Sequence, residues 1–243
     1  MFRRSVKIAY IGGGSKAWAR SFMQDLALAG DLAGEVALYD IDAPAARRNQ
    51  IIGTIMQEKE EARSDFIYTV SDTLEEALTG SDFVIISILP GSFTQMHSDV
   101  HTPEAYGILQ SVGDTVGPGG VFRALRTVPV YEEFAYAIRK CCPKAWVLNL
   151  PNRGQMPGMS EESIVETNCI FTNGFVDPIV SRPLPAGPLS LVRRNSDNID
   201  LLSEGIAERD RDKIFASFMN QPLCADLGPH EADELFKKMW ESS

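Results

Sequence analysis

The sequence predicts an α/β protein with a Rossmann-like, doubly wound parallel sheet, followed by a small C-terminal α+β cap made of a hairpin and helices. Short apolar runs rich in valine and isoleucine alternate with longer stretches of helical periodicity, which is typical of parallel βαβ units. A glycine-rich turn follows the first apolar run at residues 12–14. After residue 149 the pattern changes to prolines, turn signals and amphipathic stretches. We therefore expect two domains, 1–149 and 150–243.

The first domain is expected to alternate strands with helices that cross over in the right-handed sense. The run FVIISI at 83–88 is apolar nearly throughout, as a strand covered on both faces must be, so we place it at the centre of the sheet. We expect strands at 6–11, 35–39, 66–70, 83–88 and 146–149, and helices at 18–28, 47–63, 74–78 and 129–142.

The first strand runs directly into Gly12, Gly13, Gly14 and Ser15, and a helical stretch begins near Trp18. Glycines allow backbone N–H groups to approach a dinucleotide pyrophosphate, and the following helix N-terminus favours its negative charge. Read as G-x-G-x-x-[GA], the motif occupies positions 12, 14 and 17.

The second strand ends at Asp40, where an acidic side chain can accept hydrogen bonds from the adenosine ribose. Together with the glycine turn it predicts a site for NAD rather than NADP. The alternative is a tight strand-to-helix turn followed by an ordinary strand-end carboxylate.

Residues 107–120 are rich in glycine and lack an apolar period, so we expect a loop. Asp114 and Thr115 lie among these glycines and would reach the crevice where open α/β sheets bind substrates. A simple surface connection is the alternative.

The second domain is expected to begin with a hairpin. The run 163–171 reads as a strand, Asn173-Gly174 as the turn, and 175–180 as the partner strand. Helices are expected at 188–194, 196–219 and 229–240, with breaks near Asp210 and Pro222. On the last of them, Phe236 and Trp240 are one turn apart, and we expect them to belong to an exposed apolar face that favours self-association.

Composition excludes several classes of function. The formal net charge of −10 argues against a nucleic-acid partner, and no apolar run is long enough to cross a bilayer, so we expect neither nucleic-acid nor membrane binding and a cytoplasmic location. The four cysteines have no C-x-x-C spacing and are expected to be buried thiols. His97 and His101 share an i, i+4 spacing, which is more typical of exposed helix positions than of a metal site.

Several runs together resemble glycoside hydrolase family 4, namely Ile11–Ser15, Leu38–Asp42, Gly113–Gly120 and Leu125–Pro129. Within that family, the runs Ile88–Ser92 and Ser111–Thr115 are most similar to the α-galacturonidase branch, with the α-glucosidases next to it. Similarity to the family's closing segment continues through 150–155 and 163–167.

The resemblance implies an enzyme that uses NAD and a divalent metal such as manganese to cleave a galacturonide or glucoside by hydride transfer, elimination and their reversal. Family members are longer than this chain. The segment that is missing here normally holds a Cys-His pair, a further histidine and the general base, so the resemblance assigns no catalytic residue and no metal ligand to this sequence. Residues 150–243 are thus expected to be the remnant of a glycosidase domain.

At the junction, Asn149 and Asn152 match the family's sugar-binding strand end, although Asn152 fits the closing segment equally well. We therefore expect a family 4 glycosidase that is impaired by an internal deletion, and the resemblance implies a homo-oligomer. A non-catalytic NAD-binding protein and a small dehydrogenase remain alternatives.

Overall fold

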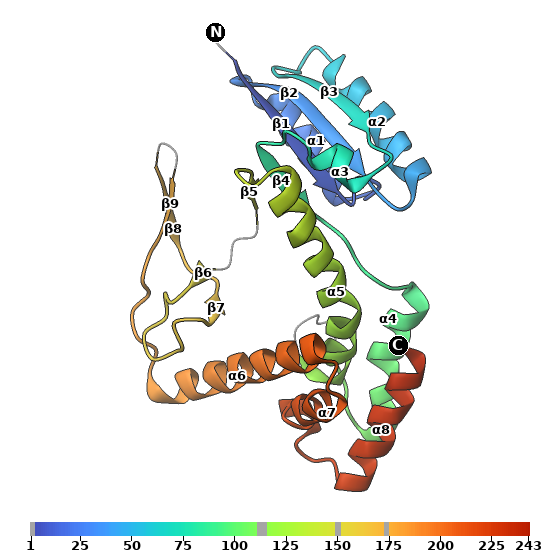
Figure 1. Ribbon diagram of the computed structural model, residues 1–243, viewed down its shortest axis with the longest axis vertical. Helices are drawn as coiled ribbons and strands as arrows, with labels where there is room; N and C mark the ends of the chain where they lie inside the picture. The colour runs from blue at the N-terminus through green and yellow to red at the C-terminus, as the bar shows by residue number, and fades with distance from the viewer. Residues whose placement is uncertain (1–2, 111–115, 149–151, 173–174) are drawn as a thin grey trace. The chain divides into compact units, whose positions relative to one another are not determined.

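The computed structural model of the chain describes residues 3–110, 116–148, 152–172 and 175–243 (Figure 1). The contacts divide the chain into two compact units. We call Met1–Leu89 with Tyr131–Asn149 the sheet unit, and Pro90–Val130 with Leu150–Ser243 the helical unit. This division differs from a single boundary after residue 149, because residues 90–130 group with the C-terminal residues.

The sheet unit confirms the predicted Rossmann-like parallel sheet. Its strand order is β3-β2-β1-β4-β5, and all four pairings are parallel. The middle strand is β1 and not the apolar run at 83–88, which forms β4 beside it. The elements are β1 (Arg4–Ile11), α1 (Trp18–Leu28), β2 (Leu32–Tyr39), α2 (Ala43–Gln57), β3 (Asp65–Val70), α3 (Leu74–Leu78), β4 (Phe83–Ile86), β5 (Trp146–Val147) and the end of α5 (Gly117–Cys141).

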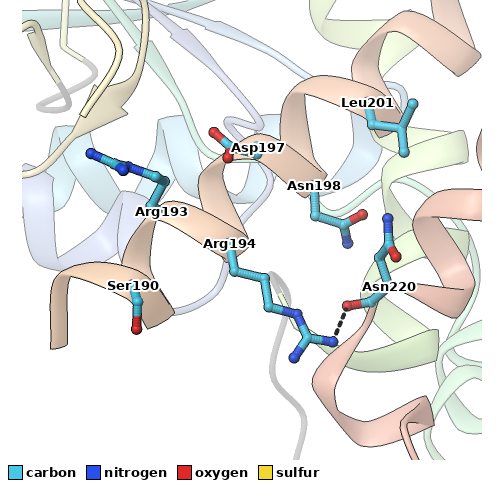
Figure 2. A pocket seen from close by; sticks show the side chains of 7 residues that line it. All are labelled: Ser190, Arg193, Arg194, Asp197, Asn198, Leu201 and Asn220. Carbon is cyan, nitrogen blue, oxygen red and sulfur yellow. Dashed lines mark hydrogen bonds between the residues drawn. The ribbon is translucent and has the colours of Figure 1, made fainter. Parts of the chain in front are cut away.

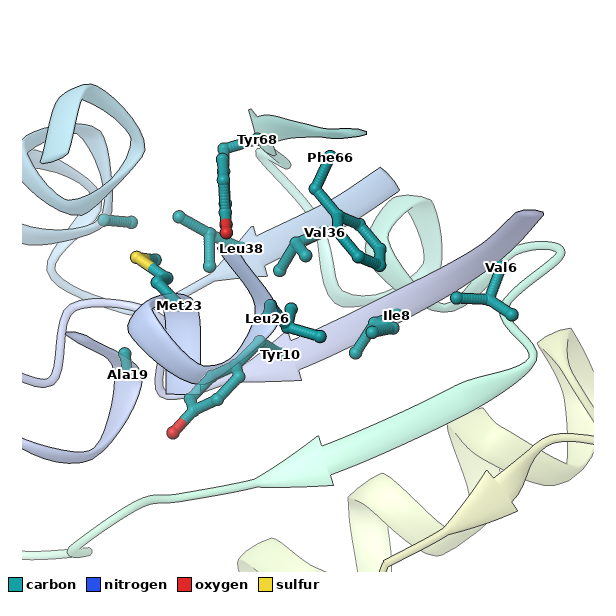
Figure 3. Close-up of a cluster of buried hydrophobic side chains, with 11 residues drawn as sticks. Val6, Ile8, Tyr10, Ala19, Met23, Leu26, Val36, Leu38, Phe66 and Tyr68 are labelled. Atoms are coloured by element: carbon teal, nitrogen blue, oxygen red, sulfur yellow. The ribbon is translucent and has the colours of Figure 1, made fainter. Parts of the chain in front are cut away.

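Alternate residues of the strands build the core of this unit. Val6, Ile8 and Tyr10 of β1 point to the same face because side chains alternate along a strand. Figure 3 shows them with Met23 and Leu26 of α1 and with residues of β2 and β3. The apolar faces of α1 and α2 thus cover one face of the sheet and fix the turn that joins β1 to α1.

The helical unit holds a small hairpin and a helical core. Strands β8 and β9 pair antiparallel, with Thr172 opposite Phe175, so the predicted hairpin is confirmed while its turn lies outside the described residues. The expected strand at 163–171 is two separate strands. The elements are α4 (Phe93–His101), η1 (Thr102–Tyr106), the start of α5, β6 (Asn152–Arg153), β7 (Ile164–Val165), β8 (Cys169–Thr172), β9 (Phe175–Pro178), α6 (Ala186–Glu208), α7 (Arg211–Met219), η2 (Pro222–Cys224) and α8 (Pro229–Ser242).

Several predicted helix limits were wrong. Helix α2 begins before residue 47 because Asp42 caps it by accepting the N–H of Ala45 at 3.0 Å. Helix α6 is continuous where two helices, 188–194 and 196–219, were expected. The break at Asp210 is confirmed, since its side chain accepts the N–H groups of Asp212 and Lys213 and starts α7.

The start of α5 corrects the predicted loop at 107–120. Residues 117–120 form its first turn, and Pro129, expected to start the helix, lies inside it. The missing N–H of a proline costs about 3 kcal/mol in a helix interior. Buried side chains on both sides of Pro129, among them Phe122 and Phe134, favour a continuous helix all the same. The two units divide α5 at Val130, next to this proline.

The prediction of an exposed apolar face on α8 was wrong. Phe236 is only 2% exposed and makes tilted or edge-to-face ring contacts with Phe122, Phe215 and Phe218 at centroid distances of 5.0–5.5 Å. Trp240 is half-buried and packs against the same cluster. These rings form the core of the helical unit, so the face that was to mediate self-association is largely internal.

Two of the four cysteines, Cys142 and Cys224, are buried as expected, and the other two are half-buried. All four are free thiols. None of the helices in the described ranges is long and apolar enough to cross a membrane.

Candidate dinucleotide site

The turn after β1 is held tightly against its own unit. Gly12 has a φ of +90°, and a Cβ at this position would overlap the carbonyl oxygen of Ser87. A Cβ on Gly13 would lie 2.8 Å from Leu38 Cβ, and one on Gly14 would lie 2.6 Å from Ala45 Cβ. The three glycines are therefore required by packing alone, which is the reading that the sequence left open beside dinucleotide binding.

The first N–H groups of the turn are used internally. Those of Gly12 and Gly13 donate to the carbonyl of Tyr39 at 2.9 and 3.0 Å, and that of Ser15 donates to Gly12 at 3.1 Å. These three N–H groups therefore have backbone partners, and the contact of this segment with a dinucleotide stays a prediction. The turn brings the next residues, Lys16 and Ala17, to the surface, where both are exposed.

The start of α1 is not capped by its own N-cap residue. Its N-cap residue is Ala17, which has no side chain that could accept a hydrogen bond, and the first turn carries no acidic residue. The Ser15 hydroxyl accepts the N–H of Trp18 at 3.2 Å. Within the described ranges, no partner is found for the N–H groups of Lys16 and Ala17. Such free donors at a positive helix end can hold a phosphate.

Asp40 lies next to this helix end, at the end of β2. Its Oδ2 accepts the N–H of Gly14 at 2.8 Å, and its Oδ1 accepts the N–H of Asp42 at 2.9 Å. The carboxylate is half-buried, and an ionised carboxylate has about four acceptor positions, so two backbone bonds leave it capacity for ribose hydroxyls. The structure thus brings Asp40 and the glycine turn together.

The predicted sugar-binding residues are not assembled by the described part of the chain. Asp114, Thr115 and Asn149 lie outside the described residues. Asn152 is part of β6 in the helical unit, where its backbone pairs with Val165 of β7.

Among the residues that the structure describes, no three His, Cys, Asp or Glu side chains are grouped to hold a metal ion. His97 and His101 are exposed on α4, with ring centroids 4.3 Å apart, and His101 Nδ1 lies 2.8 Å from Glu104 Oε1. They form a local surface cluster, as the sequence indicated.

A cavity of about 560 Å³ lies along α6 in the helical unit (Figure 2). Its basic residues serve the fold, since Arg193 donates to the carbonyl of Gly158 and Arg194 donates to that of Asn220 at 3.0 Å. Asn198 Nδ2 donates to Ser217 at 3.0 Å and ties α6 to α7. These bonds engage Arg193, Arg194 and Asn198, and the cavity is also lined by the polar residues Ser190, Asp197 and Asn220.

Sequence reasoning missed Asn49. This residue of α2 is 0% exposed, and its Nδ2 donates to the carbonyls of Gly13 and Ser15 at 2.7 and 2.8 Å. It shares the buried face of α2 with Ala46 and Gly53. A polar residue in the apolar stripe of a helix next to a glycine turn is the signal that could have found it.

Comparisons with known proteins agree with this architecture. The sequence profile of the family described as Family 4 glycosyl hydrolase matches residues 7–159. The α-galacturonidase of Thermoanaerobacter italicus is 60% identical over 147 residues, which are 60% of this chain and 31% of that protein. The chain thus spans about a third of the length of the curated relatives that it matches.

Solved structures match over more of the chain. The Bacillus subtilis protein lplD superimposes with a TM-score of 0.88 at 24% identity, covering 97% of this chain and 99% of that one. A Thermotoga maritima 6-phospho-β-glucosidase, solved with manganese, NAD+ and glucose-6-phosphate, has a TM-score of 0.82 at 14% identity, covering 97% and 98%. At these identities the likeness shows the fold of both units.

Proposed function

This chain belongs to family 4 of the glycosyl hydrolases, and from that premise we propose that it binds NAD at the turn between β1 and α1 and descends from an enzyme of the α-galacturonidase type. The observation that carries the proposal is the pair of N–H groups of Lys16 and Ala17, which have no partner among the described residues and lie at the start of α1, beside a glycine turn and the Asp40 carboxylate. Free amide donors and an acceptor for ribose hydroxyls are the two groups that a dinucleotide needs here.

The residues of this site have separate tasks. The N–H groups of Lys16 and Ala17 donate to the pyrophosphate, and Asp40 accepts the ribose hydroxyls and disfavours a 2′-phosphate by like charge. Bound NAD supplies a hydride acceptor for sugar oxidation. The tight packing of Gly12, Gly13 and Gly14 keeps the helix end and the carboxylate at a fixed separation.

A divalent metal is a different case. The described residues offer no group of three ligands for it, so they do not fit a metal ion. We propose that hydrolysis by this chain is impaired, because the family resemblance places the metal ligands and the base in a segment that the sequence does not match. The oligomeric state and the cytoplasmic location stay predictions.

Binding and turnover are to be measured on the whole chain. We expect calorimetric titration to show NAD binding, with NADP weaker. Asp40→Ala should weaken NAD by about tenfold, which corresponds to about 1.4 kcal/mol. The matched control is Asp31→Ala, which removes an exposed carboxylate of the same unit. Equal NAD affinity in both variants would contradict the role of Asp40, and the absence of NAD binding by the wild type would refute the site.

Hydrolysis of an aryl α-galacturonide is to be followed with manganese and with a chelator. We expect no turnover in either. Chelator-sensitive release of galacturonate would show that the chain is a complete enzyme.

A non-catalytic NAD-binding protein is the second candidate. The extent of the family match favours it, because the matched residues 7–159 include the turn between β1 and α1, where we propose that NAD binds, while the match ends at residue 159. A galacturonate titration in the presence of NAD separates the two, since binding of the sugar without turnover of the aryl galacturonide would favour a sensor.

A further inference from the structure

One buried side chain of the sheet unit, that of Asn49, makes hydrogen bonds both to the turn between β1 and α1 and to α1 itself. Asn49 donates from Nδ2 to the carbonyls of Gly13 and Ser15, and its Oδ1 accepts from Arg20 Nε at 3.0 Å. Both of its donor hydrogens and its acceptor therefore have partners. A buried amide is costly unless it is bonded in this way, so the arrangement fixes where the turn must lie.

The bond from Arg20 also fixes the orientation of the amide. Because the guanidinium can only donate, it must face Oδ1, which leaves Nδ2 toward the two carbonyls. Arg20 is a half-buried residue of α1, so α1, α2 and the turn are joined by this one side chain.

The consequence for the backbone follows from the planarity of the peptide. In a trans peptide the C=O and the next N–H point in opposite directions, and no described peptide bond is cis. A bond from Asn49 to the Ser15 carbonyl therefore directs the N–H of Lys16 away from α2. A bond to the Gly13 carbonyl likewise directs the N–H of Gly14, which reaches Asp40 Oδ2 at 2.8 Å.

We propose that Asn49 is a positioning residue of the dinucleotide site, which aims the Lys16 N–H at the pyrophosphate and, through Gly14, orients Asp40 for the ribose. This inference rests on the proposed function, since it assigns a task within the same NAD site. Asn49 is buried beneath the turn and acts only through the backbone.

The test compares three ligands on matched variants. Asn49→Ala removes both donors. Gln50→Ala is the control, because Gln50 is the next residue of α2 and donates in the same way to a backbone carbonyl, that of Tyr68 at 3.0 Å in β3. Dissociation constants for NAD and ADP-ribose are measured by calorimetry, and that for adenosine, which lacks phosphate, by ligand-observed NMR.

We expect Asn49→Ala to weaken NAD and ADP-ribose by about tenfold and adenosine by less than about threefold, since Asp40 keeps its bond from Asp42. Gln50→Ala should change none of the three by more than about twofold. A purely structural role for Asn49 would lower the melting temperature and weaken all three ligands alike.

Each other outcome identifies what fails. If wild type does not bind NAD, the proposed function fails before any variant is made. If wild type binds NAD and Asn49→Ala binds it equally well, this inference alone is overturned. It is also overturned if Gln50→Ala loses affinity for all ligands to the same extent.

If Asn49→Ala does not fold, Arg20→Leu is the deciding variant. It removes the hydrogen bond that holds Asn49 Oδ1, and Arg20 is only half-buried, so the substitution disturbs the core less. We expect a loss of about threefold for NAD, and unchanged NAD affinity would overturn the inference.

Discussion

The two glycine-rich segments of this chain both lead into a helix, yet they leave the helix N-terminus in opposite states. At α1, the N–H groups of Lys16 and Ala17 just before the helix have no partner among the described residues, although Ser15 Oγ accepts the N–H of Trp18. At α5, the N–H of Gly117 donates to Gln221 Oε1 at 2.9 Å, and that of Gly119 donates to Gln110 Oε1 at 3.4 Å. Pro118 between them has no N–H to satisfy.

The difference shows that glycines alone do not make an anion site. Gln221 is only 4% exposed. Its buried side-chain amide accepts the N–H of Gly117, which an anion could otherwise bind, so the N-terminus of α5 has no free donor there. The glycines of α5 serve close packing, since a Cβ on Gly119 would lie 2.7 Å from the carbonyl oxygen of Asp99. The turn at α1 uses close packing as well, but it ends in donors that the sheet unit leaves free.

The largest expected effect is at Gly12. Gly12→Ala combines a positive φ with overlap on the Ser87 carbonyl, so we expect a loss of about 3 kcal/mol or more in unfolding free energy, together with loss of NAD binding. Urea denaturation and calorimetry measure the two.

The control for Gly12 is Gly80→Ala. Gly80 also has a positive φ, +73°, but a Cβ there meets nothing within 4 Å. Only the strain of a left-handed backbone remains at Gly80, and we expect it to lower the unfolding free energy by about 1–2 kcal/mol without changing the affinity for NAD. Equal losses at the two positions would mean that close packing does not constrain the turn.

The closed helix end gives the next prediction. Gln221→Leu leaves the Gly117 N–H buried and unpaired, so we expect the unfolding free energy to fall by about 1–3 kcal/mol. NAD affinity should stay at the wild-type value, because Gln221 belongs to the helical unit. Gln24→Leu on α1, at an exposed position, should change stability by less than about 0.5 kcal/mol. A gain of phosphate binding without loss of stability would show that the two helix ends are alike after all.

The sheet unit could be predicted further than the helical unit, for physical reasons. Periodicity along one segment determines whether it is a strand or a helix, and short βαβ connections then determine the sheet. The identity of a cap depends on residues far away in the sequence, as Gln221 is from Gly117. No local pattern around residues 107–120 signals a glutamine that arrives from another helix, so a helix start was interpreted as a loop.

The same reason explains the errors at the candidate sites. The glycine turn and Asp40 are close in sequence and were found together, whereas Asn49 was overlooked because its partners are the backbone carbonyls of Gly13 and Ser15. Phe236 was expected at the surface because its partners in α5 and α7 could not be placed from sequence.

The smallest expected effect concerns the reactivity of Cys224, which lies in the short helix η2 just after Gln221. Cys224 is 1% exposed in the aromatic core, and burial raises the pKa of its thiol from 9.0 to about 12. Because the thiolate is the reactive form, we expect no alkylation of native Cys224 by iodoacetamide at pH 8. The raised pKa means that the native state retains the proton more tightly, so stability from this group is full below about pH 9 and declines as pH rises toward 12.

Alkylation of Cys224 therefore reports on how firmly the second helix end is closed. When reaction follows unfolding, its rate scales with the unfolded population, and a loss of 1.4 kcal/mol increases that population about tenfold. Gln221→Leu should accelerate labelling of Cys224 by about this factor, while half-buried Cys169 of β8 should react at the same rate in both proteins. Equal labelling of Cys224 with and without the glutamine would show that Gln221 does not hold the start of α5, and the contrast between the two glycine segments would then need another cause.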